Sequence, residues 1–306
     1  MPDLTIKPEN LVLLFIVVAM VWEVLAGRTR DGRKTREDWN MALLTATVMV
    51  LVQRPALVLV TAFIGGLLVP QWQGVLADFE AANFWWVLLG YIALEEFLHG
   101  IGHWFAHARR PKSQHLQRLQ ALFKMGHRPH HLSGGNDGRG QLSVTQTFVE
   151  HWLWWFIMPN YWFQFFCVYL GLTEVFLVGT AIKGLWAAHN HVNWNYDLYF
   201  LNHPRAWVRK TMYGLCHILT FPTQHHHHHA RGKNSGSNLC NLLAIYDWLV
   251  FDSLVIEREK PAIYGWKQSP EEEHSVLTRF LATDLAKLRV SKPASKPVSE
   301  AAKQAV

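Results

Sequence analysis

Long apolar runs separated by arginine-rich segments are the feature that most constrains how this chain can fold. The first run covers residues 10–27, and five basic residues follow it within positions 28–36. About 20 apolar residues are enough to cross a bilayer as a helix, and Lys and Arg concentrate in cytoplasmic loops. The run therefore predicts a membrane anchor followed by a cytoplasmic loop. A cleaved signal peptide is the less favoured alternative.

The next runs continue this pattern. Residues 41–69 are apolar except at 53–55, which is consistent with either one kinked span or two half-spans. The following loop, 70–83, has acidic residues but no Lys or Arg, which places it outside and favours a single crossing. Residues 84–98 then return the chain to the cytoplasm, where the basic residues of 109–139 lie.

The second half of the chain has one further apolar region and a polar end. Residues 148–188 are broken near 159–160 and 171, which predicts a hairpin of two spans. Residues 238–251 have the pattern of an apolar helix, and the tail is expected to be disordered from about 291. We therefore predict an all-α integral membrane protein, multi-pass, with about four to five transmembrane helices and a cytoplasmic histidine-rich cap.

Composition narrows the functional classes. The net charge is +6, but the sequence has no basic stripe with interleaved aromatic residues, so no nucleic-acid partner is expected. The three cysteines are widely separated and form no CxxC pair, which argues against thiolate metal sites and iron–sulfur clusters. Histidine is the unusual residue, with 18 copies unevenly spread along the chain. This surplus indicates a histidine-based metal site.

One predicted helix carries a stripe of histidines. His99, His103 and His107 recur every four residues, and Glu95 lies four residues before His99. Residues at this spacing share one face of a helix, so the stripe can present several imidazoles to one centre. A polar face turned to solvent is the alternative.

Two HxxHH motifs repeat the helical spacing. Neutral imidazole suits iron, zinc, copper and nickel, and a single tetrahedral zinc needs only four ligands. Eight or nine histidines therefore predict two metal ions. We therefore expect an all-histidine dinuclear site rather than the carboxylate-rich site of soluble di-iron bundles. The motifs are His127, His130 and His131, and then His225, His228 and His229 inside a run of five histidines.

Together these motifs resemble the fatty acid hydroxylase superfamily. These membrane di-iron enzymes include sterol desaturases, sphingolipid and fatty acid hydroxylases and alkylglycerol monooxygenase. Members carry an acidic residue seven positions before HxxxH, two HxxHH motifs, an HxN between them and a Trp-Asp pair near the end. The likeness extends from about residue 95 to 253. The matching residues are Glu96, His103, His107, the two HxxHH motifs, His191, Asn193, Pro222, Asn238, Tyr246 and Asp247.

The chain also departs from the family pattern. Trp104 stands where Arg usually follows the first His of HxxxH, and Tyr246 replaces the usual Trp. The segment between His107 and His127 is about twice as long as in the family. These differences indicate a divergent branch, so the substrate of a family member cannot simply be transferred to this chain.

The resemblance implies an O2-dependent oxidoreductase that uses two iron ions to hydroxylate C–H bonds of a membrane lipid, a fatty acyl, sterol or related lipid. The alternative is a desaturase with the same site. The chain has no haem, flavin or cysteine-cluster module, so the electron donor must be separate, such as a reductase, a ferredoxin or a cytochrome b5-like protein. The implied regions are a transmembrane anchor region at 1–94, a hydroxylase-like catalytic domain at 95–253 and a C-terminal tail at 254–306.

The implied site residues fall into two sets. The metal ligands are His103, His107, His127, His130, His131, His191, His225, His228 and His229. The residues implied in catalysis, as partners that orient the imidazoles, are Glu96, Asn193, Asn238 and Asp247.

Two ligand choices stay open at this stage, because His99 or His189 can replace a chosen histidine. His226 and His227 are expected to point away from the ligand face. From a different class, a histidine-rich divalent-metal transporter or sensor is less favoured, because most histidines lie outside the predicted spans.

Overall fold

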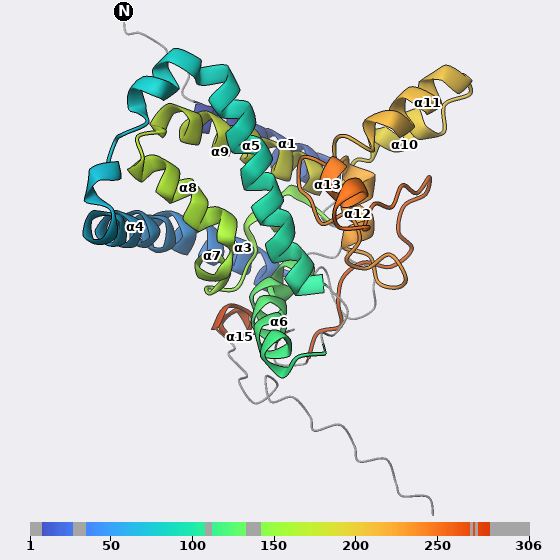
Figure 1. Ribbon diagram of the computed structural model, residues 1–306. Helices are drawn as coiled ribbons and strands as arrows, with labels where there is room; N and C mark the ends of the chain where they lie inside the picture. The colour runs from blue at the N-terminus through green and yellow to red at the C-terminus, as the bar shows by residue number, and fades with distance from the viewer. Residues whose placement is uncertain are drawn as a thin grey trace, which may run out of the picture.

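The computed structural model describes residues 8–26, 35–107, 112–132, 142–269, 272 and 275–281. Within these residues every regular element is helical, which confirms the predicted all-α class (Figure 1). The tail predicted to be disordered from about 291 lies outside the described residues. The elements are α1 (Pro8–Leu25), α3 (Arg36–Val48), η1 (Met49–Gln53), α4 (Arg54–Leu68), η2 (Pro70–Trp72), α5 (Ala77–His107), α6 (Gln114–His127), η3 (Arg128–His131), η4 (Val144–Phe148), α7 (Trp154–Ile157), α8 (Pro159–Tyr169), α9 (Thr173–His191), α10 (Tyr196–Leu201), α11 (Ala206–Leu215), α12 (Pro222–His228), α13 (Ile245–Leu249) and α15 (Val276–Leu281).

The apolar run at 41–69 belongs to one continuous helical segment, Arg36–Leu68, rather than to a hairpin of half-spans. A π-helical turn, η1, ends at Gln53, where the polar interruption begins. Pro55 lies in the first turn of α4, where its missing N–H disturbs the helix least. The Gln53 side chain donates a hydrogen bond to the Trp152 carbonyl at 2.8 Å, which ties the π turn to the loop beside the histidines.

The long helix α5 runs through the middle of the molecule (Figure 1) and packs against α6, α8 and α9. Its 31 residues include the whole predicted stripe from Glu95 to His107, so the predicted helix is confirmed. The predicted loop at 70–83 is shorter than expected, because α5 already begins at Ala77. The backbone leaves helical geometry once, at Asn83. The elements α10 and α11 project away from this body as an arm.

Two helical segments of the described chain, Arg36–Leu68 and Ala77–His107, are long and apolar enough to cross a membrane, and Asn10–Leu25 is a shorter apolar helix. Large apolar side chains face outward along these elements; Leu59, Phe63 and Trp86 are 69%, 71% and 78% exposed. A contiguous exposed apolar surface of this kind marks contact with a membrane or a partner. The number of spans, four to five, stays a prediction.

The prediction of an apolar helix at 238–251 is wrong for most of this segment. Only Ile245–Leu249 is helical, and the segment before it is an irregular loop. The cause is electrostatic: the Asp247 carboxylate accepts hydrogen bonds from the Leu239 and Cys240 amides at 2.6 and 3.1 Å. The Glu96 carboxylate accepts one from the Leu242 amide at 2.6 Å. Two buried carboxylates thus bind the amides that a helix would have used internally.

The described residues after 253 pack onto the histidine-bearing segments. The amides of Gly265 and Trp266 donate to the carbonyls of His229 and His131, both at 2.9 Å. The Arg279 guanidinium pairs with Asp38 at the start of α3, at 2.6 Å. This C-terminal segment therefore covers the site from outside. The predicted region boundaries stay predictions.

Candidate metal centre

Eight of the nine histidines predicted as ligands gather in two buried groups, each of which can hold a metal ion. Within each group the four ligand nitrogens lie within 4.8 Å of one another. We name them the first group and the second group. The first group is His107, His127, His131 and His228, and the second group is His130, His191, His225 and His229.

The two groups are built to the same plan. Each takes the first and last histidines of one HxxHH motif, which are four residues apart, and the middle histidine of the other motif. Each adds the last residue of a long helix, His107 of α5 in the first group and His191 of α9 in the second. The two motifs are therefore shared crosswise between the groups, so neither group can form without both motifs.

The spacing of the first HxxHH motif predicted that its histidines share one helical face, but the structure shows that they do not. The helix α6 ends at His127, and η3, a 3₁₀ turn with Pro129 in its first turn, carries His130 and His131. A 3₁₀ turn is tighter than an α-helix, with about 3.0 residues per turn. The second motif is helical up to His228 in α12, as expected.

Backbone carbonyls fix the orientation of several imidazoles. The Nδ1 atoms of His191 and His228 lie 2.7 Å from the carbonyls of Ala187 and Ser237, and Nδ1 of His130 lies 3.3 Å from that of Val149. A carbonyl oxygen can only accept, so each Nδ1 carries the proton and each Nε2 presents a lone pair that can bind a metal ion. This is the arrangement that orients metal-bound histidines in proteins.

The Nε2 atoms of the second group face one another. His191 Nε2 lies 3.2 Å from His130 Nε2 and 3.1 Å from His225 Nε2. With Nδ1 of His130 and His191 both protonated, their Nε2 atoms are two acceptors pointing at each other, which is repulsive unless a cation lies between them. The donor set therefore fits a bound metal ion.

The first group contains the same kind of unsatisfied nitrogens. Nε2 of His107 and Nε2 of His228 are buried and have no hydrogen-bond partner among the described residues, and the same holds for both ring nitrogens of His229 in the second group. Leaving a buried polar atom unpaired costs about 1–3 kcal/mol. Metal coordination would satisfy these atoms.

Burial keeps the imidazoles neutral. Desolvation lowers the pKa of His228 to about 4. Neutral imidazole is the form that binds metal, so the site is electrostatically prepared for a cation and disfavours protons. Desolvation, followed by repulsion from neighbouring imidazoles, lowers the pKa well below the ordinary value for His127, His130, His131, His225 and His229.

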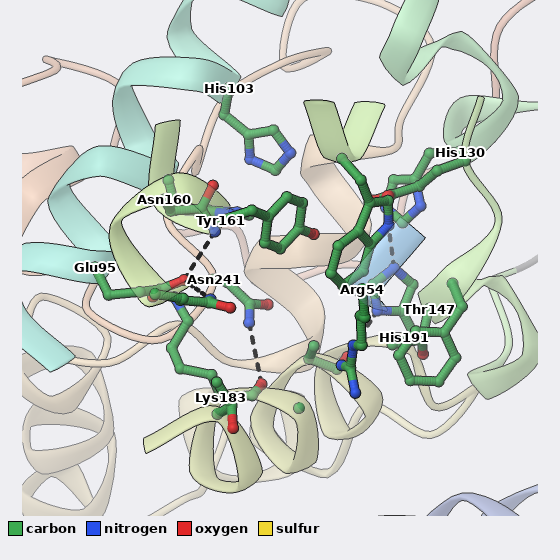
Figure 2. Close-up of a pocket in the computed structure, with 18 of the residues that line it drawn as sticks. Arg54, Glu95, His103, His130, Thr147, Asn160, Tyr161, Lys183, His191 and Asn241 are labelled. Atoms are coloured by element: carbon green, nitrogen blue, oxygen red, sulfur yellow. Dashed lines mark hydrogen bonds and ion pairs between the residues drawn. The ribbon is translucent and has the colours of Figure 1, made fainter. Parts of the chain in front are cut away.

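The two groups touch, but only one of them opens to a cavity. The rings of His131 and His229 are stacked at 4.3 Å between centroids. A cavity of about 120 Å³ is lined by three members of the second group and by no member of the first. Figure 2 shows His130 and His191 on one side of this cavity, with Glu95 and Lys183 on the other. The first group is covered instead by aromatic rings, with Trp266 stacked on His131 at 4.5 Å.

His103, the ninth predicted ligand, belongs to neither group. Its Nδ1 lies 2.6 Å from the Leu239 carbonyl, and its ring lies 4.5 Å from that of His127 between centroids. It lines the cavity together with His99. His103 is therefore a neighbour of the first group, and its role as a ligand stays a prediction that the two four-histidine groups do not require.

The other open histidines have partners away from the two groups. His189 Nε2 lies 2.7 Å from the Tyr196 hydroxyl, so the geometry favours His191 over His189. His226 lies 2.9 Å from the Tyr264 hydroxyl and 3.1 Å from the Val192 carbonyl, and His227 lies 2.8 Å from the Glu259 carbonyl. Both point away from the groups, as expected, and hold the loops around α12.

The predicted positioning residues act on the backbone more than on the imidazoles. The Asn238 side chain bonds to the backbone of Gln224 and Val255, and Asp247 and Glu96 bind the 239–243 loop. Through this loop Asp247 positions the Leu239 carbonyl, which receives the hydrogen bond from His103. The backbone N–H of Asn193 donates a hydrogen bond to the Glu23 carboxylate of α1 at 2.9 Å, which anchors the turn after His191.

Sequence reasoning missed two cations at the cavity. The Lys183 ammonium is buried between the carboxylates of Glu95 and Glu96, and its distance to Glu95 is 2.7 Å. Arg54 lines the same cavity from the start of α4. The sequence did contain a signal for both residues, because each is a charged residue inside an apolar run. In a membrane protein such a residue indicates a functional position.

Comparison with known proteins does not extend this picture: no protein-family model, no curated protein and no solved structure matches the chain.

Proposed function

We propose that this chain is a membrane-bound, non-haem di-iron oxygenase that hydroxylates a C–H bond of a lipid. The observation that carries the proposal is the pair of adjacent four-histidine groups, whose carbonyl-held Nδ1 atoms leave Nε2 lone pairs converging on each centre. The motif resemblance supports iron as the metal, and iron bound there would supply O2 activation for C–H oxidation.

The surroundings supply the other requirements of such a reaction. The cavity at the second group gives a substrate access to one side of the site, while aromatic rings exclude water from the other. The outward-facing apolar side chains of α4 and α5 support a multi-pass membrane location. The basic segments at 28–36 and 109–139 support a site on the cytoplasmic side, where a separate reductase, ferredoxin or cytochrome b5-like donor would deliver electrons.

The test is metal analysis together with product formation. Protein purified in detergent is expected to bind about two iron ions per chain, as two imidazole groups require. With O2, a ferredoxin reducing system and a membrane lipid extract it should yield a hydroxylated lipid. The variant His130→Ala should abolish this product, and His203→Ala, outside both groups, should retain it. Full activity after chelation of iron would contradict the proposal.

Desaturation is the second chemistry that the same site supports. It requires removal of a second hydrogen from the neighbouring carbon instead of hydroxyl transfer. Mass spectrometry of the product distinguishes the two outcomes, because hydroxylation adds one oxygen atom and desaturation removes two hydrogen atoms.

A further inference from the structure

A second, larger hollow adjoins the histidine-lined cavity. This apolar chamber has a volume of about 490 Å³ and lies between α1, α3, η1, α8 and α9. Apolar side chains make up most of its lining, among them Val12, Ile16, Met49, Phe165, Phe176 and Leu177. Five residues line both hollows: Arg54, Phe148, Gln164, Thr180 and Gly184. The two hollows are therefore neighbours, and these residues form their junction.

Arg54 is the one charged residue at this junction. It is also the only charged residue in the apolar stretch 39–69. It follows the π turn η1 directly, and π turns inside helices are frequent at functional sites. Its guanidinium carbon lies 5.3 Å from the centre of the Trp155 ring, so the aromatic face holds the side chain beside the cavity.

The two cations of the cavity differ in their partners. Lys183 forms ion pairs with both Glu95 and Glu96. For Arg54, by contrast, the described residues place no carboxylate in an ion pair with the guanidinium; the side chain contacts the face of the Trp155 ring and interacts electrostatically with Tyr161. An uncompensated charge at membrane depth is costly. A guanidinium offers a planar pair of donors that matches a carboxylate.

We propose that Arg54 binds the carboxylate of an amphipathic lipid whose hydrocarbon chain lies in the apolar chamber. A guanidinium that has no ion-pair partner among the described residues matches a carboxylate, and the chamber lining matches an alkyl chain. Because Arg54 lines both hollows, the polar end of the lipid then lies next to the second group and the far end lies away from it. Binding of the lipid carboxylate by Arg54 can be tested by itself, whereas the conclusion that this lipid is the substrate rests on the proposed function.

The experiment measures binding to metal-free, full-length protein at alkaline pH by tryptophan fluorescence, to which Trp155 contributes. Palmitate, methyl palmitate and hexadecanol are the probes. The variant Arg54→Met is expected to bind palmitate roughly 10- to 100-fold more weakly, because a hydrogen bond to a charged group contributes about 1.5–3 kcal/mol. Binding of hexadecanol should stay unchanged. Arg209→Met on α11, outside both hollows, is the matched control.

Two further variants keep the test decisive if Arg54→Met does not fold. Arg54→Lys keeps the charge but loses the planar pair of donors, so it should weaken palmitate binding by less than Arg54→Met. Gly184→Leu places a side chain at the junction, where a Cβ would lie 3.4 Å from the Val12 side chain, and should weaken palmitate and hexadecanol alike.

Equal palmitate affinity in the wild type and both Arg54 variants would overturn the inference, as would equally tight binding of palmitate and its methyl ester. The outcome is separable from the proposed function. Binding of palmitate through Arg54 in a protein that takes up no iron would contradict only the di-iron proposal, whereas an iron-loaded protein that ignores Arg54 would contradict only this inference.

Discussion

The two histidine groups have the same composition and a similar plan, yet their surroundings differ. Three of the four histidines in the second group line the cavity, and the apolar chamber begins beside them. The first group lies behind it, covered by Trp266 and the loop at Gly236. The difference teaches that two groups with identical ligand chemistry can differ in access: one group opens to the cavity, and the other is covered by aromatic rings.

Removing one ligand from each group is the strongest way to break this comparison. His131→Ala removes a ligand of the first group and His229→Ala one of the second, and each should retain about one metal ion per chain. The affinity of the damaged group should fall by more than about 100-fold, the upper end of what losing an outer hydrogen bond costs. Metal analysis after dialysis measures this. Loss of both ions in either variant would mean that the groups are not separate sites.

Acid should affect the feature that both groups share, their buried neutral imidazoles. In the metal-free protein the pKa of His228 is lowered to about 4 by burial, whereas in the unfolded chain it lies near 6.5. Below pH ~6.5 the unfolded state therefore binds more protons. The His228 imidazole alone lowers the free energy of unfolding by about 3 kcal/mol as the pH falls towards 4. The other buried imidazoles add to this loss.

Protonation of Asp247 has the opposite effect on the stability of the folded protein over the same pH range. Burial raises its pKa to about 6, so the folded state takes up the proton first and gains stability as the pH falls. One carboxyl cannot offset several imidazoles, and chemical denaturation at a series of pH values should show a net loss between pH ~6.5 and ~4. A metal-free protein that became more stable over this range would contradict the assignment of neutral, buried histidines.

A glycine beside His107 allows the first group to be perturbed alone. Gly236 has φ +75°, and a Cβ there would lie 2.6 Å from His107 Nδ1. Gly236→Ala should weaken metal binding at the first group by displacing His107, and should cost about 1–2 kcal/mol of stability for the left-handed backbone. Gly232→Ala is the matched control, because it also has a positive φ, +125°, but nothing within 4 Å of its Cβ. It should lower stability and leave both metal ions bound.

The smallest expected effect is a difference in rate. In the His131→Ala variant the remaining metal ion occupies the second group, which opens to the cavity. In the His229→Ala variant it occupies the first group behind Trp266. A soluble chelator should remove the metal several-fold faster from the former, measured by the absorbance of the chelate. Equal rates would show that the cavity does not control access to the second group.

Much of the site was predictable because helical spacing is a local property. Residues four apart meet on one helix face whatever the rest of the chain does. The stripe on α5 was therefore predictable, and so was the pair His225 with His229, whereas His127 and His131 meet across the junction of α6 and the 3₁₀ turn η3. The structure places His191, the lone histidine favoured by the sequence, in a four-histidine group and His189 outside both groups; the role of His191 as a ligand stays a prediction.

Local patterns were a poor guide where a distant residue competes with local structure. The segment at 238–251 has the composition of a helix, but Asp247 and Glu96 bind its amides from outside, and Glu96 is about 146 residues away in sequence. His103 has the right spacing and lies beside the first group, with its Nδ1 2.6 Å from the Leu239 carbonyl of that same loop, but it belongs to neither four-histidine group. Such contacts leave no periodic signal in the sequence.

The sequence by itself determined the helical class, the apolar segments and the set of histidines, because each of these follows from local periodicity and composition. Only the tertiary structure decided how those histidines divide. It sends His130 to a different group from His127 and His131, and it places Arg54 at the junction of two hollows. The physical reason is that a metal site and a cavity are defined by where separate helices meet, and packing between helices sets those positions.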